Sequence, residues 1–183
     1  MTDKSSDRVI LVDFNDSEVG TQDKIKAHRG DGQLHRAISV FLFNDEGKLL
    51  IQQRSEKKIV GAGLWANTAC GNVRPGEGYL DCAKRRLKEE LGIGEVELTK
   101  IGKFQYQVSF ANGFGENEMD TVFVGSFSKE VRSNPEEVSN IDWIEIEDLL
   151  NDGRSYAPWV EKIVSNQQIK DNILEFKVNK DDY

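Results

Sequence analysis

The sequence predicts an α+β domain in which a mixed β-sheet is sandwiched between helices. Short apolar runs bounded by turn residues recur along the chain, one amphipathic helical pattern interrupts them, and a second helical pattern follows the last run. A length of 183 residues fits one hydrophobic core of about 100–200 residues. We therefore expect a single domain over residues 1–183, with residues 1–7 as a frayed polar tail.

The first half of the chain predicts extended segments. Residues 9–14 are an apolar run, and the polar, glycine-containing stretch 15–33 that follows is expected to be loop. The runs 37–43 and 49–53 are joined by Asn44-Asp45-Glu46-Gly47, which is typical of a hairpin. Residues 65–70 predict a further short strand.

The second half opens with a helix over residues 78–91. Leu80, Ala83, Leu87 and Leu91 recur at three- and four-residue spacing, and Gly92 is placed to cap the end. The remaining elements follow in order: strands at 101–110 and 120–128 around the loop 111–115, a strand at 141–144, a helix beginning at 146–151, and a long final helix from Pro158 towards Phe176.

Composition excludes several classes of function. A net charge of −8 argues against general binding to nucleic acid, which requires a basic surface. No apolar run approaches the ~20 residues that span a bilayer, and the first residues do not resemble a signal peptide. We expect a cytoplasmic protein that binds neither nucleic acid nor membrane, with Cys70 and Cys82 as free thiols. Nothing in the sequence indicates an oligomeric state.

The strongest motif runs from residue 71 to residue 93. It contains Gly71, then Glu77 after five residues, and then Arg85-Arg86-Leu87-Lys88-Glu89-Glu90-Leu91-Gly92-Ile93 after seven more. This spacing resembles the Nudix box, a loop and helix whose carboxylates hold Mg²⁺ against substrate phosphates. The alternative is a solvated helix face on which Arg85–Glu89 and Arg86–Glu90 form surface pairs. One position departs from the box, because Arg86 replaces a glutamate that Nudix hydrolases use for metal binding.

The rest of the chain, from about residue 8 to residue 165, resembles one branch of this superfamily, the type I isopentenyl-diphosphate isomerases. The matching positions are His28, His35, the segment Leu64-Trp65-Ala66-Asn67-Thr68-Ala69-Cys70-Gly71, Tyr106, Glu116-Asn117-Glu118 and Trp159. The resemblance implies a Nudix fold and a small-molecule diphosphate substrate. It also implies a transition-metal site, for Mn²⁺ or Zn²⁺, built from His28, His35, Glu116 and Glu118.

The same resemblance assigns the chemistry. Moving the double bond of isopentenyl diphosphate adds one proton and removes another, with a tertiary carbocation between. Cys70 and Glu118 are the implied proton-transfer groups, Tyr106 tunes Glu118, and the ring of Trp159 is the candidate wall against the positive charge. Diphosphate binding is expected from Mg²⁺ held by Glu90 and from cations at matching positions, namely Lys24, Arg54, Lys58 and Arg86.

Each of these residues also has an ordinary structural interpretation. Cys70 can be a small buried hydrophobic residue, which is the role we assign to Cys82 inside the expected helix. Trp159 can be a core anchor, the four cations solvated surface charges, and Glu116 and Glu118 solvated carboxylates of a loop. Two features of the residues themselves favour the site. The chain's two histidines both fall on ligand positions, and Glu116 and Glu118 are two residues apart, so on a strand both carboxylates would leave the same face.

Position 72 is the main misfit. The isomerase family has a histidine two residues after the cysteine and then a proline, where this chain has Asn72 and Val73. An amide oxygen is a weaker ligand than imidazole, so Asn72 is expected to be a poor fifth metal ligand. Three functions remain open: an isomerase with an altered metal site, a Nudix hydrolase that cleaves a nucleotide or prenyl diphosphate, and a non-catalytic protein that binds diphosphate.

Overall fold

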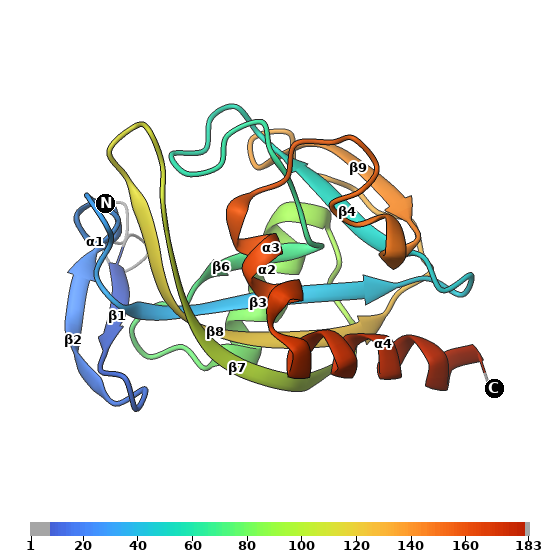
Figure 1. The fold of residues 1–183 in the computed structure, drawn as a ribbon, viewed down its shortest axis with the longest axis horizontal. Coiled ribbons are helices and arrows are strands. Elements are labelled where there is room, and N and C mark those ends of the chain that lie inside the picture. Colours follow the sequence, from blue (N-terminus) through green and yellow to red (C-terminus); the bar gives the residue numbers. More distant parts are fainter. Residues whose placement is uncertain (1–7, 182–183) are drawn as a thin grey trace.

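A computed structural model describes residues 8–181, which form one mixed nine-stranded sheet with helices on both sides (Figure 1). The strands are β1 (Arg8–Val12), β2 (Glu18–Asp23), β3 (His35–Phe43), β4 (Leu49–Arg54), β5 (Trp65–Ala66), β6 (Ala69–Asn72), β7 (Leu98–Ser109), β8 (Gly115–Ser126) and β9 (Val138–Ile144). The helices are α1 (Lys24–Ala27), α2 (Tyr79–Leu91), α3 (Pro158–Ser165), α4 (Gln167–Asp181) and the 3₁₀ helix η1 (Ile146–Asp148). The α+β fold class predicted from the sequence is confirmed, and the predicted tail at residues 1–7 lies outside the described residues.

Strand β3 is the central strand. On one side it pairs in parallel with β8 over its whole length, from His35↔Glu118 to Phe43↔Ser126. On its other side it pairs antiparallel with β1, then β6, then β4. A strand with helices over both faces is apolar on both, which explains the continuous apolar run in β3.

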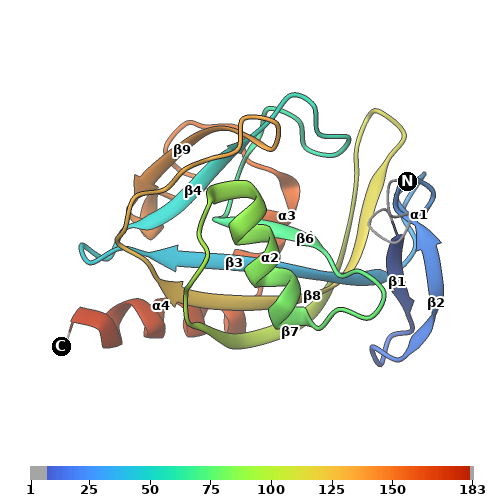
Figure 2. The same ribbon diagram turned by 180° about the vertical axis from the view of Figure 1, so that it is seen from behind.

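Successive side chains of β3 point to opposite faces of the sheet and so belong to two separate hydrophobic cores. Ile38, Val40 and Leu42 pack under α2, whereas Phe41 and Phe43 face α3 and α4. Figure 2 shows α2 lying across one face, with α3 and α4 on the other. His35 is an even number of residues from Phe41 on β3, so its side chain leaves the sheet on the same side, toward α3 and α4.

Helix α2 agrees with the predicted range and its cap, but its buried stripe differs by one position. Gly92 adopts a left-handed φ of 69° and ends the helix as expected. Leu80 is 40% exposed, while Cys82 is fully buried with Ala83, Leu87 and Leu91. The assignment of Cys82 as a buried apolar residue is confirmed.

Other boundaries differ from expectation. The stretch 15–33, expected to be loop, contains β2 and α1, because β2 is polar and gains its structure from pairing with β1. The strand expected at 9–14 ends at Val12, and Phe14 is 77% exposed. The segment 65–70 is divided into β5 and β6. Strands β7, β8 and β9 each begin before the predicted start, so Glu116 and Glu118 lie within β8.

The C-terminal helices also differ from expectation. The helix expected from residue 146 is only the short η1, and the long final helix is interrupted at Asn166. Asn166 Oδ1 accepts a hydrogen bond from the Ile169 backbone at 3.2 Å, which is how an asparagine starts a new helix.

Candidate active site and metal centre

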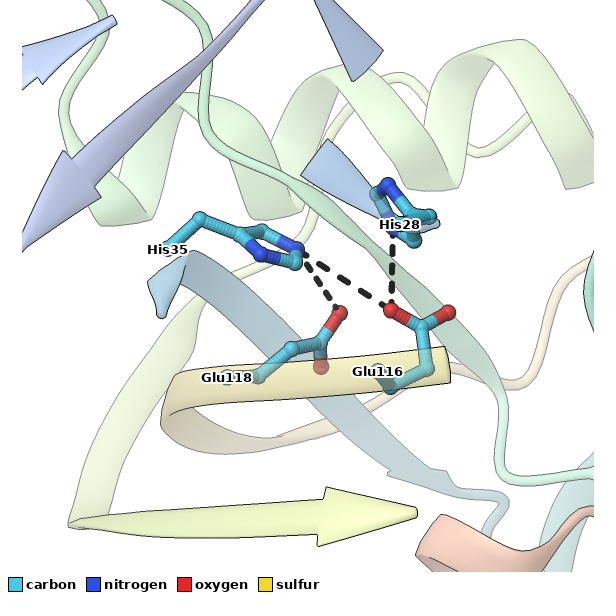
Figure 3. A group of neighbouring side chains, drawn as sticks. All are labelled: His28, His35, Glu116 and Glu118. Atoms are coloured by element: carbon cyan, nitrogen blue, oxygen red, sulfur yellow. Dashed lines mark ion pairs between the residues drawn. The ribbon is translucent and has the colours of Figure 1, made fainter. Parts of the chain in front are cut away.

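Two histidines and two glutamates converge at the N-terminal end of β3. Glu116 and Glu118 leave the same face of β8, and the parallel register places His35 beside Glu118. His28 follows α1 directly. Figure 3 shows the four side chains pointing toward one another, and their candidate ligand atoms all lie within 4.8 Å.

The turn between the two histidines is held against β8 by glycines. Gly30 donates its backbone N–H to Gly113 O at 2.9 Å, and Gly115 donates to His28 O at 2.8 Å. A Cβ at Gly115 would lie 2.6 Å from Gly30 O, so only glycine permits this approach. The close contact brings His28 and His35 to the same site despite their sequence separation.

Both imidazoles are oriented through their Nδ1 atoms. Nδ1 of His28 lies 2.6 Å from Lys24 O, and Nδ1 of His35 lies 2.7 Å from Gln33 O. A carbonyl only accepts, so each Nδ1 carries the hydrogen and each Nε2 faces the glutamates. His28 Nε2 is 3.0 Å from Glu116 Oε2, and His35 Nε2 is 3.5 Å from Glu118 Oε1. Backbone-anchored histidines of this kind are typical of metal ligands.

The four residues fit a divalent cation. All are buried, and Glu116 Oε2 accepts no well-formed hydrogen bond from the described residues. Burial disfavours ionisation of Glu116, but His28 and His35 outweigh it and hold its pKa at about 2. Burial and the neighbouring Glu116 raise the pKa of Glu118. Two adjacent buried carboxylates with imidazole nitrogens form a group that could bind a metal ion.

Asn72 approaches this group through its amide nitrogen. Nδ2 lies 3.0 Å from His35 Nε2 and 3.1 Å from Glu118 Oε1. Glu118 Oε1 only accepts, and His35 Nε2 accepts when the ring is neutral with its hydrogen on Nδ1, so in that state the nitrogen is the favoured end of the amide. The amide therefore donates toward two of the four ligand atoms in this structure. Metal binding through its oxygen, as predicted from the sequence, would require the amide to turn over.

Glu90 lies outside the histidine–glutamate group. It is fully buried on α2, where Oε2 accepts from Gln52 Nε2 at 2.7 Å and Oε1 pairs with Arg86 and Lys58. Its predicted part in binding Mg²⁺ stays a prediction.

Tyr106 and Glu118 are cross-strand neighbours on β7 and β8. The Tyr106 hydroxyl donates a hydrogen bond to Glu118 Oε2. Burial and the nearby carboxylates keep the Tyr106 pKa well above its ordinary value, so the hydroxyl keeps its proton. The contact leaves Glu118 held by Tyr106 on one oxygen and by Asn72 on the other.

Cys70 lies on β6, two residues before Asn72 and on the same face. Arg54 Nη1 is 3.4 Å from its sulfur. Burial raises the Cys70 pKa to about 11, and the positive charge of Arg54 only partly offsets this. The side chain is therefore a thiol at neutral pH and able to donate a proton.

One cavity of about 380 Å³ connects these groups. Of the residues predicted from the sequence to act in catalysis, substrate binding or metal binding, all but His35 and Glu90 line it, so the four predicted cations face the same space as the two proton-transfer candidates. Those lining residues are Lys24, His28, Arg54, Lys58, Cys70, Asn72, Arg86, Tyr106, Glu116, Glu118 and Trp159.

The position of Trp159 is compatible with both roles expected for it, a core anchor and an aromatic wall of the substrate site. It is buried at the start of α3, and its Nε1 lies 3.3 Å from Asn67 Oδ1, as a core anchor would be. It also lines the cavity, where the Arg54 guanidinium stands 4.9 Å from its ring. Part of the aromatic face is thus already beside a cation.

The carboxylates of the segment that resembles the Nudix box are paired with arginines. Arg85 holds Glu77 through two contacts, of 2.6 Å and 2.9 Å, and also reaches Glu89 at 3.0 Å. Arg86 reaches Glu89 at 2.7 Å and pairs with Glu90. Where a hydrolase would hold a metal, the described residues form a salt-bridge network.

Of the lining residues that were not predicted from the sequence, Glu137 is the one that pairs with two of the predicted substrate-binding cations. Glu137 directly precedes β9 and pairs with Arg86, 2.9 Å away, and with Lys58. It lies in the polar stretch between β8 and β9, whose acidic residues resemble ordinary surface charges. Only the folding of this stretch against α2 distinguishes it.

Comparisons with known proteins agree with this geometry. The NUDIX domain family matches residues 33–163. Isopentenyl-diphosphate Delta-isomerase 2 of Aromatoleum aromaticum is 40% identical over 158 residues, which cover 84% of this chain and 82% of that protein. The isopentenyl-diphosphate Delta-isomerase of Streptomyces coelicolor is 44% identical over 135 residues, covering 73% and 68%.

Solved structures with lower identity share the fold. A protein of Deinococcus radiodurans superposes with a TM-score of 0.71 at 22% identity, covering 86% of this chain and 97% of that one. The MutT protein of Methanosarcina mazei gives 0.61 at 21% identity, covering 79% and 96%. The chain therefore belongs to the NUDIX family and, within it, to the isopentenyl-diphosphate Delta-isomerases. No helix in the described residues has the length and apolarity needed to cross a membrane.

Proposed function

We propose that this protein interconverts isopentenyl and dimethylallyl diphosphate by a 1,3-allylic proton transfer. The observation that carries the proposal is that Cys70 and Glu118 line the same cavity as Lys24, Arg54, Lys58 and Arg86. A substrate whose diphosphate is held by these cations would have its five-carbon chain within reach of both proton-transfer groups.

The reaction requires a balanced exchange of protons. One group adds a proton to the terminal alkene carbon, and the other removes a proton from the carbon nearer the diphosphate. The Cys70 thiol carries a proton at neutral pH, and Glu118 is a buried carboxylate held by Tyr106. Positioned acid and base groups of this type each contribute about 10²–10⁴-fold to rate. The apolar side chains of Val60 and Trp159 line the cavity and would limit the access of water to the positively charged intermediate.

Metal ions complete the proposed site. His28, His35, Glu116 and Glu118 would hold Mn²⁺ or Zn²⁺, for which imidazole and carboxylate are suitable ligands. Mg²⁺ would bind with the diphosphate. In this structure Glu90 is held by Gln52, Lys58 and Arg86 and does not line the cavity, so its part as a Mg²⁺ ligand stays a prediction. A bound cation supplies positive charge that stabilises the ionised carboxylates and the diphosphate.

The competing activity is hydrolysis of a diphosphate bond. Asn72 in place of histidine favours it, because the isomerase metal site loses a nitrogen donor. Against it, Glu77, Glu89 and Glu90 are all paired with Arg85 or Arg86. Retention of Cys70, Tyr106 and Glu118 at one cavity also argues against a protein that only binds diphosphate.

Incubation with isopentenyl diphosphate and divalent metal tests the proposal. We expect NMR to show formation of dimethylallyl diphosphate, with its diphosphate group intact. Release of phosphate or pyrophosphate would make the protein a hydrolase, and binding without turnover would make it a binding protein.

A further inference from the structure

Glu137 faces the cavity from the stretch that precedes β9. Its side chain is 30% exposed, and Oε2 lies 2.9 Å from Arg86 Nη2 and pairs with Lys58 Nζ. The Glu137 backbone is held separately, since its carbonyl accepts from Ser55 N at 3.0 Å and its N–H donates to Asn134 O at 2.9 Å. The carboxylate can therefore move without displacing the main chain.

Glu137 differs from Glu90, the other carboxylate that pairs with Lys58 and Arg86. Glu90 is fully buried behind the two cations, is held by Gln52, and does not line the cavity. Among the other described carboxylates that line it, Asp23 caps α1, and Glu116 and Glu118 pair with histidines. Glu137 is thus the lining carboxylate that occupies the cavity side of these two cations.

We propose that Glu137 is a displaceable counter-anion, whose carboxylate occupies the positions on Lys58 and Arg86 that oxygens of the substrate diphosphate take. This inference rests on the proposed function, which assigns the cations to the diphosphate. Binding then exchanges one anion for another: the Glu137 side chain swings toward solvent, while Glu90 stays behind Arg86 and keeps it in place.

A displaceable carboxylate at the diphosphate site would be useful to an isomerase. Substrate and product carry the same diphosphate, so binding it more tightly lowers the KM without accelerating the chemical step. Excess affinity would slow release of the product. A resident carboxylate weakens diphosphate binding and so favours release.

The charge state of Glu137 is consistent with this role. Partial burial disfavours ionisation, but Lys58 and Arg86 overcome it and hold the Glu137 pKa at about 2. The group is an anion at neutral pH, so a ligand must compete with a full negative charge.

Titration calorimetry of the full chain with inorganic pyrophosphate, in metal-free buffer, tests the inference. Glu137→Gln keeps the shape and removes the charge, and we expect it to bind pyrophosphate at least tenfold more tightly, which equals about 1.4 kcal/mol. The matched control is Glu136→Gln. Glu136 pairs with Lys57 on the same two segments, but both side chains are about two-thirds exposed, at 66% and 64%, so its effect should stay within twofold.

Weaker or unchanged pyrophosphate binding by Glu137→Gln, with an unchanged melting temperature, would overturn the inference. Weaker binding would mean that Glu137 holds the cations in position. Absence of binding by both proteins would overturn it as well. The proposed function fails separately: tighter binding by the variant, with no isomer formed by the wild type, would retain the counter-anion and reject the isomerase.

Discussion

Asn72 is the residue at which this chain departs from the metal site implied by its resemblance to the isomerases. Its amide nitrogen lies 3.0 Å from His35 Nε2 and 3.1 Å from Glu118 Oε1. A side chain at this position therefore reaches the histidine–glutamate group directly. The amide contributes hydrogen bonds where an imidazole would contribute a ligand nitrogen.

We predict that Asn72→His increases the affinity for Zn²⁺ or Mn²⁺ at least tenfold, by about 1.4 kcal/mol, because borderline metals prefer imidazole to an amide. Titration calorimetry on both proteins measures the change. Asn117→His is the control, since it adds a histidine between Glu116 and Glu118 but on the opposite face of β8. Equal affinities for Asn72→His and wild type would show that residue 72 does not contact the metal.

At the scale of elements, the contact between β6 and α2 determines where Arg86 lies. A Cβ at Gly71 would stand 2.7 Å from Arg86 Cγ and 2.8 Å from its Cδ. The absence of a side chain at Gly71 thus lets the stem of Arg86 lie against the strand and directs its guanidinium into the cavity.

Gly71→Ala should displace Arg86 and weaken pyrophosphate binding at least threefold, since inserting a methyl group into a close contact costs roughly 1–3 kcal/mol or forces a shift. Gly94→Ala is the control, because a Cβ there would meet nothing within 4 Å. The same calorimetric titration measures both. If Gly71→Ala binds pyrophosphate as wild type does, Arg86 is not a diphosphate ligand.

The elements that the sequence predicted are those with a clear apolar period. Helix α2, the apolar strands β3 and β4, and the cap at Gly92 all follow from local pattern and are confirmed. Strand β2 and the four-residue α1 were missed because neither has an apolar period of its own. Strand β2 depends on pairing with β1, and α1 on its contacts with β1 and β2, which no local pattern reports.

Across the whole molecule, the site gathers segments that are far apart in the sequence. His28 and His35 come from the N-terminal third, Glu118 from β8 and Trp159 from α3. Their proximity could be expected from the resemblance to a known family but not from the residues alone. Glu137 was not expected by either route, because its partners Lys58 and Arg86 are 79 and 51 residues away in the chain.

Metal binding should stabilise the whole fold. Glu116 and Glu118 are buried carboxylates side by side, and a cation that binds only the folded state adds about 2.7 kcal/mol at a concentration 100 times its Kd. For a chain of this size we expect Zn²⁺ or Mn²⁺ to raise the Tm by roughly 5–10 °C. Differential scanning fluorimetry measures the shift, which Glu116→Gln should reduce. An equal shift in wild type and variant would place the metal elsewhere.

In the proposed reaction, Cys70 and Glu118 transfer protons to and from a bound isoprenyl diphosphate. Incubating the protein with isopentenyl diphosphate in D₂O tests it most directly, because a thiol exchanges its proton with solvent before donating it. We predict dimethylallyl diphosphate with deuterium in the newly formed methyl group. Cys70→Ala and Glu118→Gln should each lower the rate by at least about 100-fold with the fold intact. An intact rate in either variant, an isomer without deuterium, or release of phosphate in place of isomerisation would contradict it.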